Sequence, residues 1–153
     1  MSQTSTDRIE KQITLRAPRS RVWRALSQVG EFNAWFGVKL EGDIVPGATL
    51  RGKITHPEYA HVTLELVVDR VEPERLFSYR WHPHAVDAAV DYSKEPMTTV
   101  EFRLDEAPEG TLLTIVESGF DRLPAARRDL AFRANGGGWT AQAKNLEAHV
   151  ARG

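Results

Sequence analysis

A chain of 153 residues and 17.2 kDa has the size of one domain, which leaves little room for a two-domain enzyme. Its composition, 41% hydrophobic and 27% charged, is typical of a globular domain and excludes a disordered chain. The net charge of −1 gives no support to nucleic acid or an anionic membrane as a partner, and the absence of cysteine excludes disulfides and thiolate metal sites.

We expect a disordered tail over residues 1–8 and a single folded domain over residues 9–152. The polar start lacks the apolar segment of a signal peptide. No apolar run reaches the roughly 18 residues of a membrane span. A cytoplasmic location is therefore the expectation.

Alternating apolar positions predict a strand over residues 9–15. Pro18 suits the first turn of a helix, whose apolar stripe includes Val22, Leu26 and Val29 and which Gly30 is expected to end. A short helical turn over 31–36 follows. Six further strands, separated by turn residues, are predicted near 38–45, 48–56, 61–72, 75–82, 97–105 and 111–119.

The alternation within these strands predicts a sheet with one apolar face and one polar face. The apolar face would carry Val62, Leu64, Leu66, Val68, Phe77, Tyr79, Trp81, Val100, Phe102, Leu104, Leu113 and Ile115, and the polar face Glu65, Asp69, Arg80, Glu101 and Arg103. An apolar face needs a cover. A C-terminal helix with Trp139, Ala143, Leu146 and Val150 on one stripe is the candidate, with an interruption expected at Gly136-Gly137-Gly138.

The order of elements resembles the helix-grip fold of the START and birch-pollen-allergen-like (SRPBCC) superfamily. Within it, the chain resembles the branch named for the activator of the heat-shock protein 90 ATPase (Aha-type), over roughly residues 8–151. The motifs that carry the resemblance are APRSRVWRAL at 17–26, WFG at 35–37, EGD at 41–43, PG at 46–47, VEPERL at 71–76, YRW at 79–81, GTLLT at 110–114, ESGF at 117–120 and GGW at 137–139.

The resemblance implies an α+β helix-grip fold, in which an antiparallel sheet wraps around a long C-terminal helix and leaves an internal cavity. In the superfamily such cavities hold lipids, polyketides, hormones and other apolar molecules. The eukaryotic namesake of the branch stimulates its chaperone through two domains, whereas this sequence has the length of one. The resemblance therefore implies the fold more strongly than the function.

Glu117 is the first candidate for a functional residue, because alternation places it on the apolar face after Leu113 and Ile115. A buried carboxylate is costly unless it has partners. Two interpretations stay open. Either Glu117 lies at the end of a strand, where solvent or an arginine satisfies it, or it is a polar handle or a general acid/base inside a pocket.

The aromatic side chains and the three glycines are open to a structural and a functional interpretation. The aromatic residues either pack in the core or line an apolar pocket. The glycines either mark a kink where the chain passes close to the sheet or leave space for a ligand. Residues predicted to bind the ligand are Trp35, Phe36, Tyr79, Trp81, Phe102, Glu117, Asn135, Gly137 and Trp139.

His82, His84, Asp87 and Asp91 form the one cluster in the sequence that suggests a metal. The cluster falls in a long irregular stretch over 82–96, where Pro83 breaks the strand, so we expect neither a metal nor another cofactor. The motifs of α/β-hydrolases, dinucleotide-binding proteins, P-loop NTPases and zincins are absent from the sequence.

The predicted function is the binding of a small apolar molecule between the sheet and the C-terminal helix, without catalysis or with weak catalysis. One alternative is an enzyme that acts on an aromatic or polyketide-like substrate, with Glu117 as the general acid/base. A second alternative is a module that contacts a chaperone. A homodimer also stays open as an assembly.

Overall fold

The computed structural model of the protein describes residues 7–87 and 89–151. Within these residues, six strands form one antiparallel sheet in the order β1-β6-β5-β4-β3-β2. The elements in chain order are β1 (Arg8–Leu15), α1 (Arg19–Ser27), α2 (Val29–Phe36), β2 (Thr49–Lys53), the 3-10 turn η1 (Pro57–Tyr59), β3 (Thr63–Glu72), β4 (Leu76–Trp81), β5 (Thr98–Ala107), β6 (Gly110–Ser118), the 3-10 turn η2 (Phe120–Arg122) and α3 (Ala125–Val150). The predicted tail falls mostly on residues outside the described ranges, and β1 already begins at Arg8.

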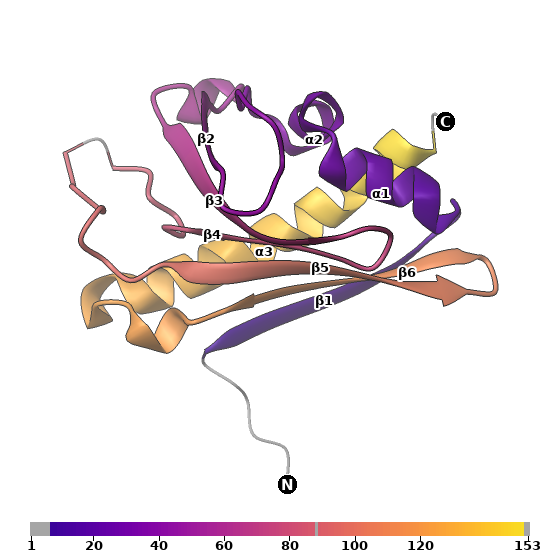
Figure 1. The fold of residues 1–153 in the computed structure, drawn as a ribbon. Helices are drawn as coiled ribbons and strands as arrows, with labels where there is room; N and C mark the ends of the chain where they lie inside the picture. The colour runs from indigo at the N-terminus through magenta and orange to yellow at the C-terminus, as the bar shows by residue number, and fades with distance from the viewer. Residues whose placement is uncertain (1–6, 88, 152–153) are drawn as a thin grey trace, which may run out of the picture.

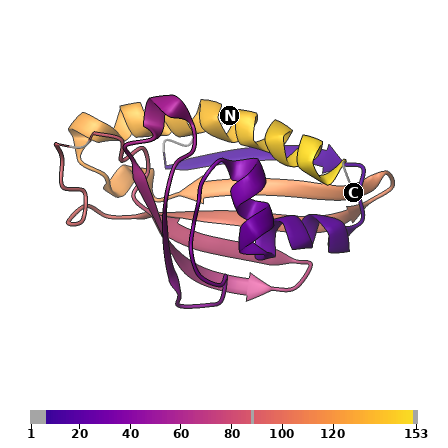
Figure 2. The ribbon, with the colours of Figure 1, turned by 90° about the horizontal axis from the view of Figure 1, so that it is seen from above.

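The helix α3 runs along the sheet, and α1 and α2 lie near its C-terminal end (Figure 1). The view from above shows the same arrangement, with the beginning of α3 at the end of the molecule that carries the connection between β4 and β5 (Figure 2). This arrangement confirms the predicted α+β class, with an antiparallel sheet packed against a long C-terminal helix. None of the described helices is long and apolar enough to cross a bilayer.

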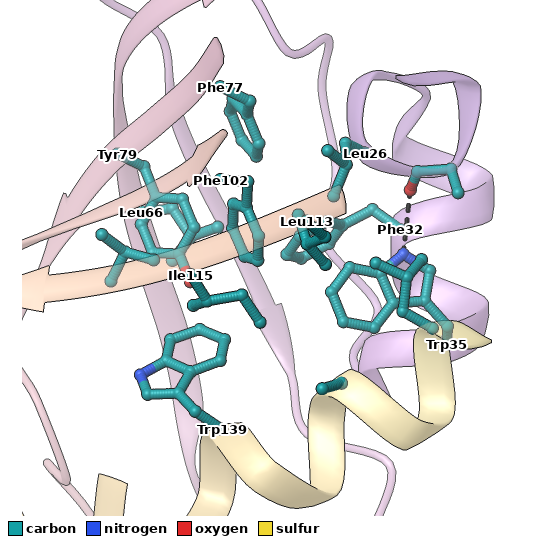
Figure 3. Close-up of a cluster of buried hydrophobic side chains, with 14 of the residues drawn as sticks. Leu26, Phe32, Trp35, Leu66, Phe77, Tyr79, Phe102, Leu113, Ile115 and Trp139 are labelled. Carbon is teal, nitrogen blue, oxygen red and sulfur yellow. Dashed lines mark hydrogen bonds between the residues drawn. The ribbon is translucent and has the colours of Figure 1, made fainter. Parts of the chain in front are cut away.

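The two faces of the sheet follow the predicted alternation. Phe77, Tyr79, Phe102 and Leu113 are buried beneath the helices, together with Ile115. On the other face, Arg80 and Arg103 are exposed. Figure 3 shows the buried cluster, in which Trp139 of α3 faces the apolar side chains of the sheet. Burial of such side chains is the main stabilising contribution to the fold, at about 25 cal/mol for each Å² of apolar surface.

The predicted strand over 38–45 is wrong. This segment makes only two isolated bridges, Val38 to Ile54 and Glu41 to Arg51. Its first part runs antiparallel beside β2, with hydrogen bonds from the Lys39 N–H to Lys53 and from the Glu41 N–H to Arg51, and it passes so close to Gly52 that an added Cβ there would lie 2.0 Å from the carbonyl oxygen of Lys39. A left-handed residue, Gly42 at φ +113°, then turns the chain away, so no regular ladder forms.

The glycines predicted to end or interrupt helices do neither. The first helix ends at Ser27, because Gln28 is extended (φ −100°, ψ 122°), and Gly30 lies inside α2. The predicted interruption at residues 136–138 is wrong, since α3 runs unbroken for 26 residues. An added Cβ at any of these three glycines would meet no atom within 4 Å, so a close approach to the sheet does not explain them. Packing of Ala131 and Trp139 on either side overrides the low helix propensity of glycine.

Candidate ligand-binding site

A pocket of about 790 Å³ lies where one end of the sheet meets α3. Its walls come from the end of α2, from η1 with the adjoining parts of β2 and β3, from α3, and from the connection between β4 and β5. This connection, residues 82–87 and 89–97, is called the β4–β5 loop. The volume lies within the range of about 300–1,000 Å³ that is common for sites of small molecules. More of the lining is apolar than polar.

The helix contributes one continuous stripe to this pocket. Ala134, Gly138, Ala141 and Asn145 follow one another at helical spacing, and Gln142 lies beside them. The neighbouring stripe of α3 is buried against the sheet and consists of Trp139, Ala143, Leu146 and Val150. The period of 3.6 residues could have separated these two stripes from the sequence alone, but only the core stripe was predicted.

A second hollow of about 520 Å³ lies at the opposite end of the sheet, beside the turn between β5 and β6. Its lining includes Arg16 and Glu109, whose side chains are 87% and 67% exposed. A solvated, charged surface of this kind offers little apolar area to bury. The pocket beside α3 is therefore the candidate site.

Glu117 is completely buried and accepts four hydrogen bonds. One carboxylate oxygen, Oε2, accepts from the Trp81 indole at 2.8 Å and from the Thr98 hydroxyl at 2.5 Å. The other oxygen, Oε1, accepts from the Trp139 indole at 2.7 Å and from the Asn135 amide at 2.9 Å. The four donors fill the acceptor positions of a carboxylate and come from β4, β5 and α3.

The predicted apolar-face position of Glu117 is confirmed, but the strand-end interpretation is not. Its side chain reaches neither solvent nor an arginine, since it is 0% exposed and makes no salt bridge among residues 7–87 and 89–151. Two of its donors, Trp81 and Asn135, themselves line the pocket, whereas Glu117 does not. The carboxylate thus lies behind the pocket wall and fixes the orientation of two wall residues.

The field of this buried carboxylate reaches Tyr79. Burial, and then the negative charge of Glu117, raise the pKa of Tyr79 well above 10.0, so its phenol stays protonated. The Tyr79 hydroxyl has no hydrogen-bond partner among the described residues. Tyr79 lies in the core beside Trp81, with ring centroids 5.2 Å apart.

The predicted aromatic residues divide into two groups. Trp35, Phe36 and Trp81 line the pocket. Tyr79 and Phe102 lie behind them in the core with Trp139, which packs 5.7 Å from Phe102 and 5.8 Å from Trp81 between ring centroids. The Trp35 indole is held in place by a hydrogen bond of 2.9 Å to the carbonyl oxygen of Ala25 (Figure 3).

Of the two smaller α3 residues predicted to bind the ligand, Asn135 and Gly137, one lines the pocket and the other does not. Asn135 lines the pocket and carries the hydrogen bond to Glu117. Gly137 is exposed and does not belong to the pocket lining, where its neighbour Gly138 is found instead.

The β4–β5 loop forms one wall of the pocket and is fastened by Arg127, which the sequence did not single out. The guanidinium of Arg127 pairs with Glu95 at 2.8 Å and donates to the carbonyl oxygens of Pro83 at 2.9 Å and His84 at 3.1 Å. It also lies 4.5 Å from the centroid of the Tyr92 ring. These contacts hold His84 and Tyr92 at the pocket.

Three residues of the His82, His84, Asp87 and Asp91 cluster hydrogen-bond to other groups of the β4–β5 loop. His82 pairs with the carbonyl oxygen of Glu95 at 3.1 Å, and Asp91 accepts hydrogen bonds from Ser93. Asp87 accepts from the backbone of Ala89 at 2.9 Å. Among residues 7–87 and 89–151, no three His, Asp or Glu side chains come together as metal ligands do.

Comparison with known proteins adds evidence on the family. The chain matches the family described as "Activator of Hsp90 ATPase homolog 1-like protein" over residues 16–151. No curated protein matches it. The solved structure of protein MLL2253 from Mesorhizobium loti is similar, with a TM-score of 0.75 and 25% identity, over 95% of this chain and 97% of that chain.

Two further structures share the fold. DynU16, a protein in the dynemicin biosynthetic locus, has a TM-score of 0.71 and 23% identity, over 94% of this chain and 47% of that chain. The Aha1 dimer from Colwellia psychrerythraea has a TM-score of 0.70 and 15% identity, over 94% of this chain and 95% of that chain. The match over residues 16–151 and the helix-grip fold confirm the resemblance seen in the sequence, and the chain belongs to the family of Activator of Hsp90 ATPase homolog 1-like proteins.

Proposed function

We propose that the protein binds a small, largely apolar molecule in the pocket beside α3. The observation that carries this proposal is the pocket itself, about 790 Å³ with Trp35, Phe36 and Trp81 in its lining. Aromatic walls with a few polar groups are typical of sites for small molecules. Gly138 adds to the space, because no side chain projects from α3 at that position.

The position of Glu117 favours binding over catalysis. A general acid or base must reach its substrate directly or through one water molecule. Glu117 is 0% exposed, and its four acceptor positions are filled by protein donors. The alternative, an enzyme acting on an aromatic or polyketide-like substrate, has the likeness to DynU16 in its favour but requires Asn135 or Trp81 to leave the carboxylate.

Partners and location remain predictions. The Colwellia psychrerythraea structure is a dimer, which keeps a homodimer open for this chain. A contact with a chaperone rests on the family's description alone. The cytoplasmic location rests on the lack of cysteine.

The proposal is tested by filling the pocket from α3. Gly138→Leu places a side chain in the pocket, whereas Gly137→Leu makes the same change one position away, outside the lining. Both glycines are helical and exposed, and an added Cβ meets no atom within 4 Å at either, so the pair is matched.

Affinity for 1-aminoanthracene, an uncharged aromatic dye, is measured by its fluorescence. We expect Gly138→Leu to weaken binding at least about tenfold and Gly137→Leu to change it by less than about twofold. Equal affinities of the two variants, both folded by circular dichroism, would contradict the proposed site.

A further inference from the structure

The charges around the pocket are unevenly distributed. Among the described residues that line it, none is lysine or arginine, and Glu65 is the one acidic side chain. Glu65 forms an exposed ion pair with Arg51. His84 stays neutral near pH 7, because burial and then the charge of Arg127 lower its pKa below 6.5. The lining also holds His56 and His82, but it offers no lysine or arginine to a ligand carboxylate.

Behind this lining lies a negative charge without a counter-ion. Glu117 is bonded to two indoles, a hydroxyl and an amide, all uncharged, and no salt bridge reaches it within the described part of the chain. Hydrogen bonds stabilise such a charge locally but do not cancel its field. In a buried setting the field is screened far less than in water.

Two arginines that contact residues of the pocket wall are engaged elsewhere. Arg127 is paired with Glu95 and donates to two carbonyl oxygens of the β4–β5 loop. Arg51 is paired with Glu65. Neither guanidinium belongs to the pocket lining, so neither is placed to receive a ligand carboxylate.

We propose that the pocket selects its ligand by charge, accepting a neutral or cationic aromatic molecule and rejecting a carboxylate. This inference rests on the proposed binding function. A carboxylate entering the pocket would lose its hydration, meet no lysine or arginine in the lining and be repelled by Glu117. An ammonium group would also lose hydration, but the charge of Glu117 and the faces of Trp35, Trp81 and Tyr92 would offset that loss.

The test uses three probes that share a naphthalene ring. They are 2-naphthylacetamide, which is neutral, 2-naphthylacetate, which is an anion, and 2-(2-naphthyl)ethylamine, which is a cation at pH 7.5. Their affinities are measured by calorimetry for the unmodified protein, for Glu117→Gln, and for Glu101→Gln as a control on the outer face of the sheet. The order of affinities in the unmodified protein is informative even if Glu117→Gln folds poorly.

We expect the acetate to bind at least about tenfold more weakly than the amide, and the amine at least as tightly as the amide. Glu117→Gln should reduce the difference between acetate and amide to less than about threefold, and Glu101→Gln should leave it unchanged. An acetate that binds as tightly as the amide, or a difference that survives in folded Glu117→Gln, would overturn the inference while leaving the binding function intact. Failure of all three probes to bind would overturn the binding function, and the inference with it.

Discussion

Replacing Glu117 by glutamine tests whether the buried carboxylate organises the pocket wall. Glutamine keeps the shape of the side chain but turns one acceptor oxygen into an amide N–H₂ group. The Thr98 hydroxyl can rotate and the Asn135 amide can turn, so both can adapt. The indoles of Trp81 and Trp139 are donors only, and each occupies a different oxygen of Glu117. Whichever way the glutamine lies, one buried indole N–H faces another donor.

A buried donor without a partner costs about 1–3 kcal/mol. We therefore expect Glu117→Gln to lower the free energy of unfolding by about 1–3 kcal/mol, measured by urea denaturation with linear extrapolation. The control is Glu101→Gln, which removes a carboxylate paired with Arg103 at 3.0 Å on the outer face and should cost less than about 1 kcal/mol. If both variants unfold at the same urea concentration with equal slopes, the four-donor network is not what fixes this wall.

Two further predictions concern the β4–β5 loop. Arg127→Met removes an ion pair and two hydrogen bonds to the loop and should lower the free energy of unfolding by about 1–3 kcal/mol. The control Arg133→Met, at an exposed position, should change it by less than about 0.5 kcal/mol. Equal losses for the two variants would show that Arg127 does not fasten the loop. Burial and then the charge of Arg127 lower the pKa of His84, so the His84 imidazole is protonated at a lower pH in the folded protein than in the unfolded chain. The contribution of His84 to the free energy of unfolding should therefore be fully present above about pH 6.5 and be lost as the pH falls through the lowered pKa. His84→Asn, which suits the φ of 49° at this position, should flatten that fall in a series of urea midpoints, and parallel curves for the two proteins would contradict the assignment.

The fold could be predicted largely from local periodicity. A period of two marks which side chains of a strand share a face, and it placed Glu117 and Ile115 correctly on the apolar side. The same reasoning failed for residues 38–45, because the close approach to Gly52 is a contact between segments that no local pattern reports and the left-handed Gly42 turns the chain away from β2. It also failed at Gly136–Gly138, where packing on both sides of the glycines outweighs their propensity.

The site was harder to predict, because its parts come from distant segments. Alternation placed Glu117 and Trp81 on one face, but the hydrogen bonds from Thr98, Asn135 and Trp139 depend on how α3 and β5 pack together. The role of Arg127 depends on a contact with Glu95, which lies 32 residues earlier in the sequence. Long-range contacts of this kind leave no periodic signal in the sequence.

The four tryptophans allow the central claim to be tested in one experiment. Each indole N–H gives its own signal in a proton–nitrogen correlation spectrum, and the chain has four tryptophans. Trp35 and Trp81 line the pocket, Trp139 lies just behind Trp81, and Trp23 of α1 lies outside the lining.

Addition of 1-aminoanthracene to saturation should shift the indole signals of Trp35 and Trp81 strongly and leave that of Trp23 in place. A spectrum in which Trp23 alone moves, or in which none of the four signals moves while the dye is bound, would contradict the claim that this pocket is the binding site.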